Sequence, residues 1–236
     1  MCGKYYADRE FIPHLSTLFK DVGILPDQEL REEWERVLLE DDGPDVTSGS
    51  DHDQILDVSP TDRAIVISQS EDGLVASKMK WGFRDPYHES LVINARSESA
   101  AEKPMFAESV RERRCVIPAS GYYEWDRSKS RYRFTRPDGG LVLLAGIYRH
   151  EIMTDKLGDP QDNEGQRATE PHFTILTATA NECMKPVHPR MPVTVDPGEI
   201  KTWIMDRSMT DELLGRDQME LLRVQDSGQI ALNLGL

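Results

Sequence analysis

The chain has 236 residues, of which 38% are hydrophobic, and its formal net charge is −14. This length and apolar content suffice for one sizeable core, so we expect a single domain over residues 1–236. The negative charge excludes broad binding of a phosphate backbone over the whole surface. No run of eighteen apolar residues occurs and the N-terminus lacks the pattern of a signal peptide, so we expect a cytoplasmic protein without a membrane span.

The first half of the chain changes from helical to β-prone patterns. Residues 27–40 carry apolar side chains at helical spacing, which predicts an amphipathic helix. Residues 41–55 are rich in Asp, Ser and Gly and predict an acidic loop without chemistry. From Arg63 onward, short β-prone runs alternate with turn residues, which predicts a core made mainly of strands.

The second half adds helices at the periphery. A helix is predicted over 105–113, and a polar, hairpin-type loop over about 151–170. Asp196 and Pro197 form a helix start, and the helix should run through Trp203. The fold class expected is α+β: a single domain with a mainly antiparallel, barrel-like β-sheet core and peripheral helices.

Cysteine and histidine spacing gives no case for a metal or another cofactor. The three cysteines, Cys2, Cys115 and Cys183, are too few and too far apart for a disulfide framework or a metal knuckle. The six histidines form no HExxH pattern. We expect reduced thiols, no metal and no cofactor.

Charge is unevenly distributed along the chain. Residues 103–136 contain nine Lys or Arg against four Asp or Glu, on an otherwise acidic protein. A local basic face could bind an anionic partner, although such side chains are often only solvated.

Cys2 carries the most distinctive chemistry. If Met1 is removed, residue 2 bears an amine and a thiol on adjacent carbons, and such an aminothiol condenses with an aldehyde to an imine and then to a five-membered thiazolidine. With a reference pKa of about 7.7 to 8.0, part of the amine is unprotonated at neutral pH. The alternative is a cysteine that stands by accident in a short, disordered terminus.

Five segments in order resemble the SOS response-associated peptidase (SRAP) family, over nearly the whole chain. The matching segments are Met1-Cys2-Gly3, Trp81-Gly82, Ile93-Asn94-Ala95-Arg96-Ser97-Glu98, the run from Ile117 to Trp125, and Thr177-Ala178 followed by His188-Pro189-Arg190-Met191-Pro192. The resemblance implies a DNA-damage protein of the SOS response, nucleoid-associated in a prokaryote, that binds single-stranded DNA. It would cross-link abasic sites covalently through Cys2 and protect them, with autocatalytic or aminopeptidase removal of Met1 and a lyase-like activity.

The resemblance also implies roles for individual residues. Cys2 is the nucleophile, and Asn94, Glu124 and His188 form its pocket. Glu124 would take the proton of the terminal amine and His188 would protonate the sugar ring oxygen, while Asn94 would donate a hydrogen bond to developing charge. The alternatives are an ion-paired glutamate, a surface histidine and a turn-forming asparagine.

Further positions would contact DNA. Trp81 could stack on a base, although a tryptophan in a strand is more often part of the core. Arg96 would contact a phosphate, or instead form an exposed ion pair. Pro118, Met191 and Pro192 would form an apolar wedge or pocket wall. The other expected contacts are Gly3, Lys4, Gly82, Arg84, Trp125 and Arg190.

Two positions depart from the family pattern. Lys4 stands where an arginine is common, which keeps the charge but loses the two-pronged geometry suited to phosphate. Asp57 replaces an asparagine, and its carboxylate would repel a phosphate at that segment. Two other functions also stay open: an N-terminal-nucleophile peptidase or amidohydrolase acting through Cys2, and a non-covalent single-strand binder.

Overall fold

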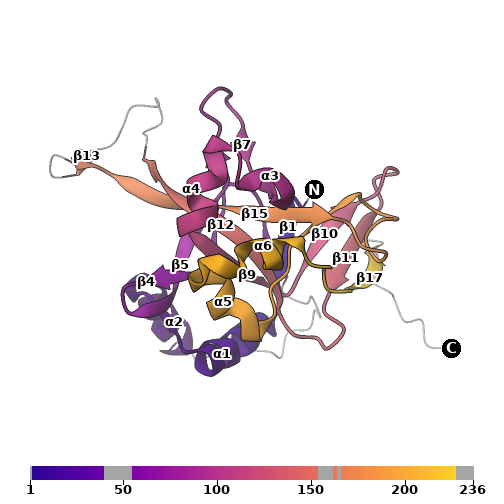
Figure 1. Ribbon diagram of the computed structural model, residues 1–236. Helices are drawn as coiled ribbons and strands as arrows, with labels where there is room; N and C mark the ends of the chain where they lie inside the picture. Colours follow the sequence, from indigo (N-terminus) through magenta and orange to yellow (C-terminus); the bar gives the residue numbers. More distant parts are fainter. Residues whose placement is uncertain (1, 40–54, 154–161, 164–165, 227–236) are drawn as a thin grey trace.

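The computed structural model describes residues 2–39, 55–153, 162–163 and 166–226 (Figure 1). Within them the chain forms a sheet-rich α+β fold with peripheral helices, which confirms the predicted fold class. The predicted acidic loop falls outside the described residues, apart from Ile55.

Five strands close into a barrel. The neighbours β5–β4, β4–β9, β9–β12 and β12–β15 are antiparallel. The ring closes where β15 runs parallel to β5, with Phe173 opposite Trp81. These strands are β4 (Arg63–Ser70), β5 (Gly73–Trp81), β9 (Arg114–Ala119), β12 (Val142–Ile152) and β15 (Thr169–Thr179).

Short strands extend the barrel at its margins. Both β8 (Asn94–Arg96) and β16 (Arg190–Pro192) pair with β15. Two segments that carry candidate residues are therefore neighbours of the same strand. The other additions are β2 (Ile24–Pro26) on β5, the hairpin of β6 (Phe83–Arg84) with β7 (Leu91–Val92), and the hairpin of β13 (Asp162–Asn163) with β14 (Gln166–Arg167). The last of these lies between β12 and β15, in the region predicted as a hairpin-type loop.

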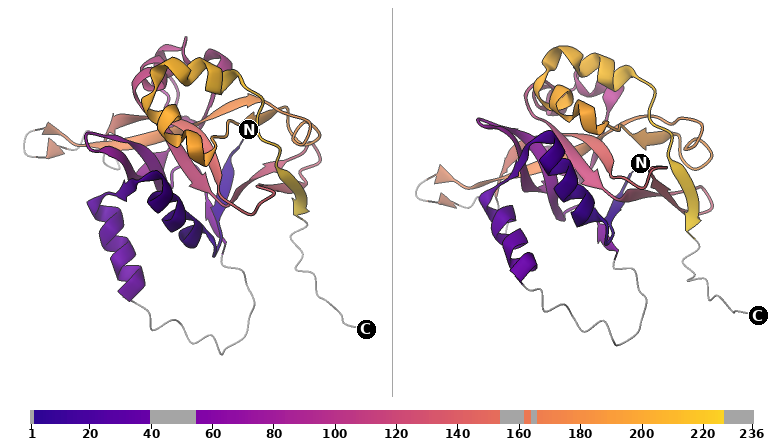
Figure 2. Two further views of the ribbon diagram at one scale, coloured as in Figure 1. Left: turned by 60° about the horizontal axis from the view of Figure 1, so that its bottom comes forward. Right: turned by 90° about the horizontal axis from the view of Figure 1, so that it is seen from below.

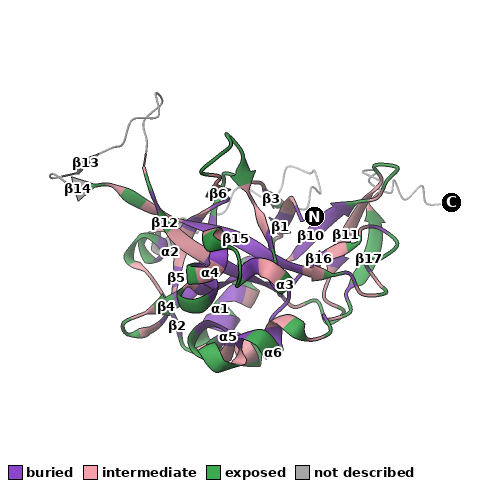
Figure 3. Ribbon diagram, turned by 45° about the horizontal axis from the view of Figure 1, so that its top comes forward, coloured by how far each residue is buried: buried purple, intermediate pink, exposed green. Residues whose placement is uncertain are grey.

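A second sheet of five strands includes the N-terminal strand β1. Its strand order is β17-β11-β10-β1-β3 (Figure 3). The strands are β1 (Lys4–Ala7), β3 (Leu56–Val58), β10 (Gly121–Trp125), β11 (Arg131–Thr135) and β17 (Leu222–Asp226). Tyr5 lies opposite Tyr122 across β1 and β10, which brings the N-terminal segment alongside the strand that holds Glu124.

The helices lie at the edge of the molecule, with α1 and α2 (indigo) separate from α5 and α6 (gold) in Figure 2. The three predicted helices are confirmed as α2 (Gln28–Leu39), α4 (Pro104–Glu112), and η1 (Pro197–Glu199) leading into α5 (Ile200–Met205). In η1, Asp196 and Glu199 form a reciprocal capping box. The remaining elements are α3 (Ser97–Ala100), η2 (Arg207–Met209) and α6 (Thr210–Gly215).

Helix α1 (Phe11–Val22) was not predicted, and the sequence interpretation is corrected here. Its buried residues Phe11, Leu15, Leu18 and Phe19 follow helical spacing, so the signal was present. The helix ends at Gly23, whose φ of 75° suits glycine and whose N–H donates to the carbonyl of Phe19.

Apolar side chains form two clusters on opposite faces of the barrel strands, because successive residues of a strand point to opposite sides. One cluster includes residues of α1, α4 and α5 and lies under the helices. The other, here called the inner cluster, lies between the barrel strands and the second sheet. Cys2 belongs to the inner cluster and has 0% of its surface exposed. Of the helices in the described part of the chain, none has the length and apolarity to span a bilayer.

Candidate functional site

Cys2 lies directly before β1 and is held by a residue from far along the chain. The Nδ2 of Asn94, the first residue of β8, donates a hydrogen bond of 2.8 Å to the carbonyl oxygen of Cys2. The Oδ1 of Asn94 is buried and accepts no hydrogen bond from the described residues. The Cys2 thiol makes one weak contact, 3.8 Å from the Lys4 carbonyl oxygen. The structure thus brings Cys2 and Asn94 together.

Glu124 approaches Cys2 from β10. Its side chain faces the interior of the molecule and is 3% exposed, and residue 122 on the same strand points to the same side. Burial raises the pKa of the Cys2 thiol well above its usual value, and the negative charge of Glu124 raises it further. The thiol in this structure is therefore protonated at neutral pH.

His188 lies in the segment between β15 and β16, and its ring is oriented by the main chain. The backbone N–H of Arg190 donates to Nδ1 at 3.0 Å. The Arg190 carbonyl is equally close to Nδ1, but the N–H can only donate, so we assign Nδ1 as the acceptor. In this tautomer the ring carries its hydrogen on Nε2, where it can donate a hydrogen bond.

The side chain of Arg190 is occupied within the protein. Its guanidinium pairs with both carboxylate oxygens of Glu98 and also donates to the Thr177 carbonyl. The hydrogen bonds from Arg190 hold the pKa of Glu98 at about 2. Because Arg190 also orients His188, this pair connects the His188 segment to the start of α3, two residues after Arg96. Arg190, which was expected to contact DNA, thus forms hydrogen bonds within the protein in this structure.

Several other expected DNA contacts are buried. Trp81, with 0% exposure, lies between Tyr5 and Phe173, at ring-centroid distances of 5.2 and 6.0 Å. No face of its indole is free for a base, so its burial fits the alternative of a core residue. Gly82 next to it is also buried, with a φ of 112° that favours glycine.

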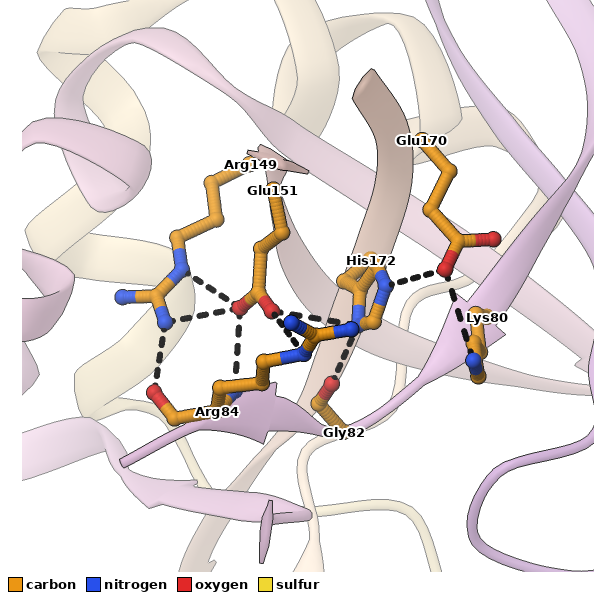
Figure 4. Close-up of polar contacts among 7 residues, drawn as sticks. All are labelled: Lys80, Gly82, Arg84, Arg149, Glu151, Glu170 and His172. Atoms are coloured by element: carbon orange, nitrogen blue, oxygen red, sulfur yellow. Dashed lines mark hydrogen bonds and ion pairs between the residues drawn. The ribbon is translucent and has the colours of Figure 1, made fainter. Parts of the chain in front are cut away.

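The apolar candidates are likewise buried, and Arg84 is paired with a residue of the protein itself. Pro118, Met191 and Pro192 are buried in β9 and β16, so in this conformation they wall the interior and cannot insert into DNA as a wedge. Arg84 belongs to a polar network with Glu151, which accepts from its backbone N–H at 2.9 Å (Figure 4).

Five of the expected contacts keep substantial accessible surface. Gly3 and Lys4 are half-buried, the Arg84 side chain is 42% exposed, Arg96 is exposed, and Trp125 is 38% exposed. Among the described residues, Arg96 has no ion-pair partner within 4 Å. Lys4 is paired with Asp57.

Sequence reasoning missed three tyrosines near these residues. Tyr87 is 86% exposed on the loop between β6 and β7, and β7 leads into Ile93 and Asn94. Tyr5 and Tyr122 are in the inner cluster with Cys2, and neither hydroxyl has a hydrogen-bond partner among the described residues. The alternation in the run Gly121 to Trp125 puts Tyr122 on the face of Glu124, and this signal could have found it.

No metal site accompanies this arrangement in the described ranges, since nowhere in them do three or more His, Cys, Asp or Glu side chains gather to hold an ion. The chemistry available is that of the Cys2 thiol, a carboxylate, an imidazole and an amide.

Comparison with known proteins gives the family. The family model described as SOS response associated peptidase (SRAP) matches residues 1–229. The chain belongs to this family. The abasic site processing protein YoaM of Bacillus subtilis is 30% identical over 166 residues, which cover 66% of this chain and 68% of that protein. The abasic site processing protein YedK of Escherichia coli is 25% identical over 203 residues, covering 84% of each chain.

A solved structure also shares the fold. A crystal structure of a protein from Bordetella bronchiseptica superposes with a TM-score of 0.66 at 20% identity, over 95% of this chain and 99% of that one. The sheet arrangement around Cys2 is therefore that of a fold seen by crystallography.

Proposed function

We propose that this SRAP protein cross-links covalently to abasic sites in single-stranded DNA through Cys2, once Met1 has been removed. The relatives named abasic site processing proteins support this target. The observation that carries the proposal is the 2.8 Å hydrogen bond from Asn94 to Cys2, because it fixes residue 2 beside Glu124, where a free amine would need an acceptor for its proton.

The amine reacts first. An abasic deoxyribose opens to an aldehyde, and the imidazolium form of His188 suits the role of the acid that protonates the ring oxygen as it opens, since the Arg190 carbonyl, 3.0 Å from Nδ1, can accept the hydrogen of its second nitrogen. The Cys2 amine adds to the aldehyde carbon, Glu124 takes the proton that nitrogen releases, and loss of one water gives an imine. This order agrees with the raised pKa of the thiol, which keeps sulfur in the unreactive form.

The thiol then closes the ring. Sulfur adds to the imine carbon while its proton passes to the imine nitrogen, and Glu124 can carry that proton. The product is a thiazolidine that contains the former aldehyde carbon, and the balance for the whole reaction is one water released. Blocking the aldehyde in this way would protect the abasic strand from cleavage.

The residues with accessible surface supply the contacts to DNA. Lys4 and Arg96 would neutralise phosphates next to the lesion, and Tyr87 and Trp125 would stack on flanking bases. Because the protein as a whole is acidic, we expect binding to stay confined to this region.

The peptidase of the family name corresponds, in this proposal, to cleavage of the bond between Met1 and Cys2. Removal of Met1 by the protein itself or by an aminopeptidase frees the same amine. Intact-mass measurement of the Cys2→Ala, Glu124→Gln and His188→Gln chains tests self-processing, which predicts that Met1 is retained in one or more of them.

The central experiment is to incubate the full chain, shown by intact mass to lack Met1, with an oligonucleotide that contains one abasic site. We expect an adduct that survives heating and a denaturing gel, with the summed mass less one water. An oligonucleotide of the same sequence without the abasic site should give none, and so should the Cys2→Ala chain. Absence of the adduct with the wild-type chain would overturn the proposal.

The same preparations separate the two other functions. Turnover of a peptide or amide that is lost in Cys2→Ala, without any adduct, would favour the amidohydrolase. If the wild-type and Cys2→Ser chains bind abasic and intact strands with equal affinity, this would favour the non-covalent binder.

A further inference from the structure

We propose that Trp81 is a positioning residue that acts through Asn94, and that it has no contact with a base. This inference rests on the proposed function, since it concerns the rate of the reaction at Cys2. Its starting point is one hydrogen bond: the indole Nε1 of Trp81 donates to the carbonyl oxygen of Ile93 at 3.0 Å.

The carbonyl of Ile93 belongs to the peptide group that enters Asn94. It also accepts a hydrogen bond of 3.2 Å from the backbone N–H of Ile175, at the start of the parallel pairing between β8 and β15. A carbonyl oxygen has two lone pairs, so these two donors use both. The orientation of the peptide plane between Ile93 and Asn94 is therefore set from two sides.

That plane determines where the amide of Asn94 points. Asn94 is the first residue of a strand of only three residues, so little regular structure holds it from the N-terminal side. Its Nδ2 reaches the Cys2 carbonyl, and its buried Oδ1 has no partner among the described residues. A small rotation of the peptide would move both atoms, because both lie at the end of the Asn94 side chain.

Trp81 itself is firmly held, as a positioning group must be. Its ring is fully buried between Tyr5 and Phe173. Its backbone N–H donates to the Asp62 carbonyl at 3.0 Å, and its carbonyl accepts from Thr61 at 3.0 Å. The indole, which is fixed by the barrel, thus fixes the position of the Ile93 carbonyl through its hydrogen bond.

The polar network in Figure 4 fixes Gly82, the residue after Trp81. The Gly82 N–H donates to the Phe173 carbonyl at 2.8 Å, and the Gly82 carbonyl lies 2.7 Å from Nδ1 of His172. The Nε2 of His172 lies 3.1 Å from Glu170, so the ring is held at both of its nitrogens. A Cβ atom at position 82 would lie 3.2 Å from the Cβ of Leu91, so this close approach also requires glycine.

The two roles for Trp81 predict different kinetics. A base platform contributes to binding, so its loss would raise the DNA concentration that gives half the maximal cross-linking rate. A positioning group contributes to the reacting geometry, so its loss would lower the maximal single-turnover rate constant instead. The second outcome is expected here.

The test is the Trp81→Phe chain, which keeps an aromatic ring and loses the N–H donor. We expect the maximal rate constant for cross-linking an abasic oligonucleotide to fall by about tenfold or more, because misplacing a reacting group by about 1 Å can cost about a hundredfold. The half-saturating DNA concentration should change by less than about twofold. Combination with Asn94→Ala should add no further loss, since Trp81 acts only through Asn94.

Trp203 offers a matched control. It is 1% exposed on α5, and its Nε1 donates to the Cys115 carbonyl at 2.8 Å, so Trp203→Phe loses the same kind of buried hydrogen bond elsewhere in the fold. We expect a comparable drop in melting temperature with an unchanged rate constant. If Trp81→Phe does not fold, 3-benzothienylalanine at position 81 removes the N–H and keeps the shape of the indole, with the same expected result.

Two outcomes would overturn the inference while leaving the proposed function intact. One is a raised half-saturating concentration at an unchanged maximal rate, which is the behaviour of a base platform. The other is wild-type kinetics in the Trp81 variant. Failure of the wild-type chain to form any adduct would instead overturn the proposed function.

Discussion

Lys4 and Asp57, the two positions that the sequence resemblance predicts to depart from the family's pattern, form an ion pair with each other. The Nζ of Lys4 on β1 lies 2.7 Å from Oδ2 of Asp57 on the neighbouring strand β3. About a third of each side chain is exposed, so the pair lies at the surface. Asp57 therefore holds the cation that a phosphate next to Cys2 would otherwise attract.

Replacement of Asp57 by asparagine should tighten the binding of single-stranded DNA. An exposed ion pair is worth about 0.2–1 kcal/mol, so its removal should raise the affinity by a factor of about 1.4 to 5 at low salt. The released charge should also steepen the dependence of log affinity on log salt by about 0.7, the value for one more phosphate contact on a single strand. Fluorescence anisotropy of a labelled oligonucleotide over a salt series measures both.

The control for this change is Glu112→Gln, which removes one negative charge from another exposed ion pair, that of Glu112 with Arg207. It should leave the salt dependence as in the wild type. An Asp57→Asn chain with wild-type affinity and salt dependence would show that Lys4 does not contact DNA.

The pairing of Glu98 with Arg190 should make stability depend on pH. The pKa of Glu98 is about 2 in the folded chain against 4.5 for an ordinary glutamate, so the carboxylate stabilises the fold above about pH 4.5, and the gain is lost as the pH falls toward 2. Because the Glu98 side chain is 54% exposed, solvent screening limits the effect to about 0.5–1 kcal/mol. Urea denaturation of the wild type and Glu98→Gln should give a difference at neutral pH that narrows by about pH 3.

Glu182→Gln is the matched variant, because Glu182 lies in the His188 segment and pairs with Lys185 while 81% exposed. Its difference from the wild type should be small at every pH. A Glu98→Gln difference that is constant over the pH range would rule out the pairing as its cause.

Most of the strands and helices from Arg63 onward could be predicted from the sequence because they depend on local spacing, whereas α1 was missed although its spacing is helical. The closure of the barrel could not be predicted, since it depends on a parallel contact between Trp81 and Phe173, which are far apart in the sequence. The same holds within the site. The sequence motifs indicated Asn94 and Cys2 separately, but the hydrogen bond between them is seen only in the folded chain.

Residue type alone also did not predict which side chains are accessible to DNA. An arginine and a tryptophan suit DNA contacts, yet Arg190 is tied to Glu98 and Trp81 is enclosed by aromatic rings. Tyr87 is more exposed than either of these side chains, and it lies in a loop without a recognised motif. Partners of such side chains come from distant strands, which local patterns do not specify.

His188 should govern the rate of the reaction and not the affinity for DNA. Its replacement by glutamine removes the imidazole that would transfer a proton, and general acid catalysis contributes about 10²–10⁴-fold, so we expect a loss of about 10²-fold or more in the maximal cross-linking rate constant. Binding of an intact strand should stay within about twofold. His150→Gln, at an exposed position of β12, should leave both quantities unchanged. Equal rates in the two variants would exclude a proton-donating role for His188.

Tyr87 should show the opposite behaviour. Stacking of a base on an aromatic ring is worth about 1–3 kcal/mol, so Tyr87→Ala should raise the half-saturating concentration of an abasic oligonucleotide about fivefold or more, with the maximal rate constant unchanged. Met205→Ala, which removes a 43% exposed apolar side chain from α5, should change neither. Because Trp81 lies two residues before the hairpin of β6 and β7 and Tyr87 lies in its loop, the two variants test one segment for two functions. A fall in the rate constant of Tyr87→Ala at unchanged half-saturation would mean that the loop positions Asn94 and does not bind a base.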